Sequence, residues 1–296
     1  MRPSLVLLPA IAYGLLTLIF SRRAGVRDMS EALVKAHLVI FAFIAVSTEA
    51  LSAIHAISFP ILLMAWFLFL LVCVVAAALL LRRKSQGFAL PEWRAVTPLT
   101  ALRAGALAFL LATTLATAFL YPPNNWDSMT YHMARVAHWI SNRNISFYPT
   151  AIPRQNFQMP LAEFAIMHLQ LLTGADWYAN LVQWVSFLVL VCLSPLTAVE
   201  LGLSHRQQLL AAVVMATLPM AILQASSTQN DLVVSSFVMA FGLFMLRLRQ
   251  HLSAENALLA ALALVRACAP DQSHGLALLC WPRHGSGRPA ASGRQR

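Results

Sequence analysis

Charged residues are unusually scarce in this sequence. They make up 11% of the 296 residues, whereas soluble domains carry about 25%. Hydrophobic residues make up 59%, and the mean hydropathy is +0.68. So few charges cannot cover an ordinary water-facing surface, which excludes a soluble globular domain of any size. The apolar surface must face lipid instead, and we predict an integral membrane protein.

Cysteine motifs and basic stripes are also missing. The four cysteines form no CxxC pair and no Cys/His spacing typical of a metal site. The net charge is +10, but the basic residues lie in short clusters between apolar runs. A nucleic-acid-binding surface would show a continuous basic stripe with interleaved aromatic residues. The sequence therefore predicts no nucleic-acid partner, and its basic clusters are typical of loops that anchor membrane spans.

Long apolar runs recur along the chain. A helix needs about 20 mostly apolar residues to cross a bilayer. We predict an all-α, polytopic membrane helix bundle of seven to eight spans, the eighth starting near Ala257 and cut short. The complete candidates are Pro3–Phe20, Leu33–Leu51, Phe59–Leu81, Ala104–Tyr121, Leu181–Val199, Leu209–Leu223 and Leu232–Leu246.

The loops between these spans differ in basic charge, which predicts an orientation. Loops on one side carry eleven Lys and Arg residues, and those on the other side carry three. Short basic loops stay in the cytoplasm. We therefore expect the long segment 122–178 and the loop 224–231 to face outward together.

The outward segment 122–178 is the longest stretch outside the predicted spans, and long ordered loops are usually functional. It contains amphipathic patterns. The first predicts a helix from about Asp127 to Ser141. The second, Leu161–Leu172, is too short to span, so we expect it to lie on or dip into the outer interface, with Gly174 ending it.

Composition divides the chain into residues 1–101 with three spans, residues 102–264 with the outward segment, and a tail, 265–296. The tail is polar, rich in Gly, Pro and Arg, and without a period. It fits a disordered basic cytoplasmic tail. We favour a reading-frame shift near Val265, because sliding degenerate codons by one base permits apolar residues that would complete the eighth span. The chain would then be the N-terminal part of a longer protein.

Asp127 is the first candidate for chemistry. It follows a span and opens a predicted helix, so its carboxylate can serve as a helix N-cap. A carboxylate at the outer membrane face can equally be a general base. The sequence leaves both interpretations open, and the two roles can coexist.

Basic and titratable residues gather in the same segment. Arg154, Arg135, His132 and His138 could bind a phosphate, whose geometry the planar Arg guanidinium matches. The alternative is that they face water or reach toward lipid phosphates.

Other ionisable residues also have two interpretations. Glu163 either faces water at the interface or turns toward the loop. Asp231 either caps the following span or supplies a second carboxylate for a divalent metal ion or a substrate. Lys35, Glu49 and His55 lie near the ends of the second span, where we expect them to reach the aqueous boundary.

The segment 122–180 resembles the first large extracytoplasmic loop of GT-C-fold membrane glycosyltransferases. That group includes protein mannosyltransferases, aminoarabinose transferases and RgtA/B/C/D-like bacterial proteins. In it, an acidic residue after a span is the catalytic carboxylate, and Asp127 occupies that place. Three extra spans precede Asp127 here, and Ser128 stands where many members have a second acid. The matching elements are Trp126-Asp127-Ser128, Tyr131-His132, Arg154-Gln155, Met159-Pro160-Leu161 and Gly174.

The resemblance implies transfer of a sugar from a polyprenyl-phosphate donor to an acceptor at the outer face of a bacterial inner (plasma) membrane. Asp127 would be the base, and Asp231 with Glu163 a second acidic site. A transporter or flippase, a non-enzymatic membrane scaffold and an inactive truncated transferase are the alternatives. The residues implied to bind substrate and phosphate are Arg154, Arg135, His132, His138, Tyr131 and Gln155.

Overall fold

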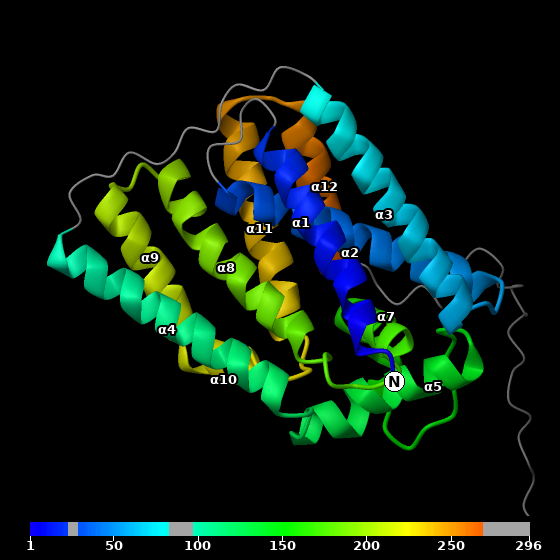
Figure 1. Cartoon of the computed structure of the whole chain (residues 1–296). Helices are drawn as coiled ribbons and strands as arrows, with labels where there is room; N and C mark the ends of the chain where they lie inside the picture. The colour runs from blue at the N-terminus through cyan, green and yellow to red at the C-terminus, as the bar shows by residue number, and fades with distance from the viewer. Residues whose placement is uncertain (23–28, 83–96, 269–296) are drawn as a thin grey trace, which may run out of the picture.

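The computed structural model describes residues 1–22, 29–82 and 97–268, and every regular element in these ranges is helical (Figure 1). The all-α prediction is therefore confirmed for this part of the chain. In chain order the elements are η1 (Pro3–Val6), α1 (Leu7–Ser21), α2 (Met29–Ala53), α3 (Phe59–Arg82), α4 (Pro98–Leu120), η2 (Ser128–His132), α5 (Met133–Asn142), α6 (Arg154–Phe157), α7 (Leu161–Thr173), α8 (Leu181–Glu200), α9 (His205–Thr217), α10 (Pro219–Gln224), α11 (Asp231–Gln250) and α12 (Ala254–Cys268).

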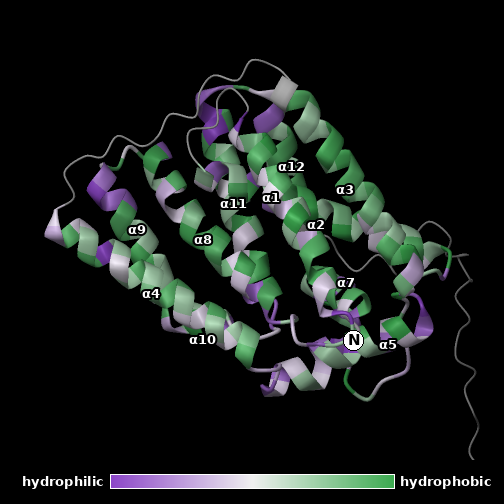
Figure 2. Ribbon diagram, viewed as in Figure 1, coloured by the Kyte–Doolittle hydropathy of each residue, from purple (hydrophilic) through white to green (hydrophobic). Residues whose placement is uncertain are grey.

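Within the described ranges, six helices are long and apolar enough to cross a membrane, namely α1 with η1, α2, α3, α4, α8 and α11. Figure 2 shows hydrophobic residues along the bundle and polar residues gathered toward helix ends and in the short helices. This pattern is that of a polytopic membrane protein.

The expected span Leu209–Leu223 is not one continuous helix. It divides into α9 and α10 at Leu218, whose backbone is extended. The cause is Pro219, because the residue before a proline is pushed away from helical geometry. Neither piece alone has the length of a span.

The eighth apolar run forms α12, which begins before Ala257 and continues past Val265. Residues 269–296, which make up most of the tail that we expect to be frame-shifted, lie outside the described residues. So do five of the eleven basic residues on the predicted cytoplasmic side: Arg23, Arg27, Arg83, Lys84 and Arg94.

Helices α2 and α8 form the centre of the bundle. In each, 61% of the most apolar 18-residue stretch is buried inside the protein, against 6% in α4. Helix α2 packs on α1, α7, α8 and α12, whereas α4 packs on α8 and α9 at one edge (Figure 1). A peripheral apolar helix of this kind presents its surface to lipid.

Buried ion pairs join the ends of four helices on one side of the bundle. Lys35 of α2 lies 2.9 Å from Glu31 and 2.8 Å from Glu255 of α12. Arg247 of α11 lies 3.0 Å from Glu31 and 2.9 Å from Glu200 of α8. The expectation that Lys35 reaches water is therefore wrong, because it is only 5% exposed.

The short helices η2, α5, α6 and α7 gather at the opposite end of the bundle (Figure 1). There the backbone N–H of Thr228 donates to Ser128 Oγ at 3.4 Å. Segment 122–178 and loop 224–231 therefore meet at this end of the bundle, and their expected outward orientation stays a prediction.

Helix α7 does not lie on the surface as an interfacial helix would. Ten of its 13 residues are buried, and it packs against α2, α3 and α5. A helix of 13 residues is too short to span a membrane. Its neighbours in the bundle bury most of its surface instead. It ends, as predicted, at Gly174, whose φ of 75° suits a residue without a Cβ.

Candidate functional site

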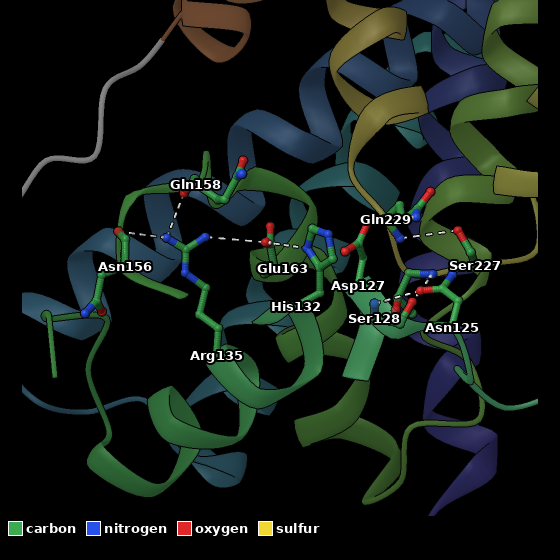
Figure 3. Close-up of polar contacts among 11 residues, drawn as sticks. Asn125, Asp127, Ser128, His132, Arg135, Asn156, Gln158, Glu163, Ser227 and Gln229 are labelled. Atoms are coloured by element: carbon green, nitrogen blue, oxygen red, sulfur yellow. Dashed lines mark hydrogen bonds and ion pairs between the residues drawn. The ribbon is translucent and has the colours of Figure 1, made fainter. Parts of the chain in front are cut away.

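The N-terminal turn of the first outward helix is capped by Asn125 and not by Asp127. Asn125 Oδ1 accepts from the backbone N–H of Ser128 at 2.7 Å (Figure 3). Asp127 already has helical φ and ψ, and its side chain makes no cap hydrogen bond. The N-cap interpretation of Asp127 is therefore wrong, and its half-buried carboxylate is available for other contacts.

The next turn, η2, is a π-helical turn and not a regular α-helix. Such turns are rare and are often found at functional sites. Its wider i→i+5 spacing changes which side chains share a face. The rings of Tyr131 and His132 lie 4.1 Å apart, and the charge of Asp127 acts on the Tyr131 hydroxyl.

Charged residues from several parts of the chain act on the Tyr131 phenol. Burial raises the pKa of this phenol, the charges of Asp127, Asp231 and Glu163 raise this pKa further, and the charge of Arg154 opposes them. The Arg154 guanidinium lies 5.9 Å from the centre of the Tyr131 ring. The phenol therefore stays protonated.

Loop 224–231 contributes Gln229 to this site. Its Nε2 donates to Asp127 Oδ2 at 3.4 Å (Figure 3). The Gln183 side chain of α8 accepts from the backbone N–H of Val233 at 3.1 Å. These contacts hold the start of α11, and so Asp231, near η2.

Glu163 forms a buried polar cluster next to this site. Its Oε1 accepts from His132 Nδ1 at 2.8 Å and lies 3.4 Å from a terminal guanidinium nitrogen of Arg135 (Figure 3). Glu163 is 0% exposed, so the water-facing interpretation is wrong and the carboxylate does turn toward the loop. The positive charge of Arg135 balances the buried carboxylate.

Arg135 is placed as a structural residue and not as a phosphate ligand. Its guanidinium donates to the backbone carbonyls of Asn156 at 3.0 Å and Gln158 at 2.7 Å. It also lies over the Trp139 ring at 4.8 Å, and the residue is only 1% exposed. The predicted phosphate-binding role of Arg135 is not supported, because its donors already hold the segment that carries Arg154.

Two atoms in the cluster retain hydrogen-bonding capacity. Within the described residues, His132 Nε2 and Glu163 Oε2 are buried and have no hydrogen-bond partner. Buried polar atoms in folded proteins are nearly always paired. Figure 3 shows the His132 ring between Glu163 and Asp127. An additional hydrogen-bonding group, such as a ligand oxygen, is the natural partner for Nε2.

Gln155 and His138, both predicted to bind substrate, have other contacts. Gln155 is buried, donates to the Thr130 carbonyl at 2.7 Å and accepts from the Tyr148 hydroxyl at 3.1 Å. His138 is exposed and stacks on Tyr148 with ring centres 4.0 Å apart. Gln155 therefore fastens α6 onto η2, and neither side chain is among the groups around the Tyr131 hydroxyl.

Sequence reasoning missed the residues that join segments far apart in the chain. Asn125, Gln183 and Gln229 carry no local signal beyond being polar and near helix ends. His168 is also buried, accepting from Trp66 Nε1 at Nδ1 (3.2 Å) and contacting Thr48 Oγ1 at 2.9 Å. Burial lowers the pKa of His168 to about 3, so it is neutral.

Among the described residues, no three His, Cys, Asp or Glu side chains gather closely enough to hold a metal ion. A divalent ion at Asp231 therefore stays a prediction. No protein-family model, curated protein or solved structure matches the chain.

Proposed function

We propose that this protein is a GT-C-like membrane glycosyltransferase. It moves a sugar from a polyprenyl-phosphate donor to an acceptor hydroxyl at the outer face of a bacterial inner membrane. We further propose that α9 with α10, and α12, complete a bundle of seven to eight crossings. Without matching relatives, the proposal depends on the residues themselves.

The observation that carries it is a polar site at one end of the bundle, where the Arg154 guanidinium lies 5.9 Å from the centre of the Tyr131 ring and the charges of Asp127 and Asp231 act on the Tyr131 phenol. These residues lie at one end of a bundle of apolar helices, where a lipid-linked donor would present its headgroup. A carboxylate beside a cation provides the base and the leaving-group stabiliser that sugar transfer needs.

The chemistry follows from these roles. Asp127 accepts the proton of the acceptor hydroxyl, whose oxygen then forms a bond to the anomeric carbon of the donor sugar. The bond between that carbon and the phosphate oxygen breaks, and both of its electrons leave with the polyprenyl phosphate. Arg154 stabilises the negative charge on the departing phosphate.

The remaining residues assist these two. The Tyr131 phenol, held protonated, donates a hydrogen bond to the donor, and His132 Nε2 contacts a phosphate or sugar oxygen. Glu163 holds the imidazole of His132 through Nδ1. Asp231 orients the acceptor or the sugar.

A transporter is the second candidate, because charged residues are buried between helices of the bundle. Intramembrane ionisable residues often mark transport pathways. The pairs of Lys35 and Arg247 connect fixed helix ends, however, and suit a structural junction better than a path across the membrane.

The first test is Asp127→Asn in the purified chain, reconstituted in liposomes with a panel of polyprenyl-phosphate hexoses and a panel of hydroxyl-bearing acceptors. Liberated polyprenyl phosphate is measured by mass spectrometry, and donor binding by thermal stabilisation. We expect the unmodified chain to bind a donor and release the lipid phosphate. Release should fall at least 100-fold in Asp127→Asn, with binding retained, because only the base is lost.

Asp176→Asn is the matched control, because this half-buried carboxylate lies at the same end of the bundle but outside the site. It should retain full release. Donor binding without release would fit a truncated, inactive transferase. If no donor binds, or if Asp127→Asn releases as much as the unmodified chain, the proposal is wrong.

A further inference from the structure

A cavity of about 340 Å³ lies between α1, α2, α7 and α8. None of its lining residues belongs to segment 122–160, which carries most of the candidate site. Helix α7 separates the two regions. Glu163 in its first turn contacts His132, whereas Ala165 and His168 further along line the cavity.

The burial of the lining residues shows where the cavity opens. Phe41, Ala165 and His168, from α2 and α7, are buried and form its floor. Ala10 of α1 and Val185 of α8 are exposed or partly exposed. Helix α1 packs on α2 and α3, whereas α8 packs on α2, α9 and α11. The mouth is therefore lateral, between two membrane-spanning helices.

The polar groups on the wall already have partners inside the protein. The Tyr13 hydroxyl donates to the Leu33 carbonyl at 3.2 Å, and Trp184 Nε1 donates to Thr114 Oγ1 at 3.2 Å. Both ring nitrogens of His168 are also engaged. A ligand in this cavity therefore meets a surface that offers dispersion contacts and needs no hydrogen bond.

The size and position of the cavity point to one kind of occupant. At about 30 Å³ per water-sized group, the volume of about 340 Å³ holds roughly ten methylene-sized groups. That matches a stretch of a single hydrocarbon chain. The residues that α1 and α8 contribute to the lining belong to the first halves of these helices, which begin at the end of the bundle that carries segment 122–178. Water is a poor occupant, because apolar cavities give it no partners.

We propose that one acyl chain of a phospholipid, from the leaflet on the side of segment 122–178, enters between α1 and α8 and occupies this cavity. The acyl chain fills the space between α1 and α2 on one side and α7 and α8 on the other. This binding site is independent of sugar transfer. We assign it to a bilayer phospholipid and not to the donor because α7 stands between the cavity and the polar cluster.

The test uses the full chain in liposomes of phosphatidylethanolamine and phosphatidylglycerol that contain a trace of phospholipid with a diazirine on the acyl chain. After irradiation, adducts are mapped by mass spectrometry. We expect adducts on Ala165 and His168, which annular lipid cannot reach because both are at least 96% buried. A second arm uses a diazirine-labelled polyprenyl phosphate at the same concentration.

Two variants complete the experiment. Ala10→Trp fills the mouth and should reduce the floor adducts at least tenfold. Ile11→Trp, on the neighbouring residue, which does not line the cavity and is 48% exposed, should leave them unchanged. Absence of floor adducts in the unmodified chain, or floor adducts from the polyprenyl phosphate in place of the phospholipid, would overturn the assignment. Mapping the unmodified chain decides the question even if Ala10→Trp does not fold.

Discussion

At the scale of residues, side chains of the same kind have two different roles in the candidate site. Arg135 and Arg154 are both arginines of one loop, yet Arg135 is buried against Glu163 and two carbonyls whereas Arg154 is exposed. A buried guanidinium whose two terminal nitrogens are engaged is poorly placed to bind substrate. Arg154 is the cation with capacity for a phosphate.

From the buried cluster we predict that Glu163→Gln lowers the stability of the fold. Removing this charge leaves the buried Arg135 without its counter-charge, and breaking a buried pair costs about 3–5 kcal/mol. We expect the free energy of unfolding to fall by this amount. The measurement is circular dichroism in mixed micelles that contain a rising fraction of denaturing detergent.

Glu255→Gln is the matched control for this change. Glu255 also pairs with a cation, Lys35, but its side chain is 47% exposed. Its loss should cost less than about 1 kcal/mol, because Glu255 is half exposed and the buried Lys35 keeps its second partner, Glu31, at 2.9 Å. If Glu163→Gln also costs less than about 1 kcal/mol, the Glu163 cluster does not stabilise the fold.

At the scale of elements, Arg247 connects three helices. It extends from α11 to Glu31 of α2 and Glu200 of α8, and its side chain is 12% exposed. A charge pair in this environment persists only if several partners compensate for lost hydration. We infer that these contacts set the register between α2, α8 and α11.

Arg247→Met tests this junction while preserving an unbranched side chain. It should lower the free energy of unfolding by about 3 kcal/mol or more, because two buried carboxylates lose a cation. Arg249→Met, in the same turn but exposed, should change it by less than about 0.5 kcal/mol. A small effect of Arg247→Met in the same detergent titration would mean that apolar packing alone holds the helices.

At the scale of the whole molecule, the two ends of the bundle differ. One end carries the buried ion pairs of Lys35 and Arg247, and the other carries the site around Tyr131. The loop charges predict that the Tyr131 end faces outward. The proposed function requires this orientation, because the donor would be used at the outer face.

Cysteine labelling tests the orientation. In a variant without the four native cysteines, we expect Asn124→Cys to react with a membrane-impermeant maleimide in intact cells. Leu252→Cys, at a position 94% exposed between α11 and α12, should react only after permeabilisation. The reverse pattern would place the site in the cytoplasm and exclude the proposed reaction at the outer face.

The sequence alone was enough to predict the helical class, most span positions and the stretch that holds Asp127, Tyr131 and Arg154. These properties depend on local features, because a run of about 20 apolar residues specifies a span whatever its neighbours are. The division of the sixth run, Leu209–Leu223, at Leu218 also has a local cause, because Pro219 stands in the sequence. Its effect was overlooked because hydropathy ignores backbone geometry.

Only the tertiary structure decided which polar residues act together. The contacts of Gln229 with Asp127, Thr228 with Ser128 and Arg247 with Glu31 join positions 102, 100 and 216 residues apart. Periodicity indicates which side of a helix is apolar but not which distant group a polar side chain will meet. The same limit explains why Arg135 and Arg154 looked alike in sequence, since burial is a property of the packed bundle and not of the residue.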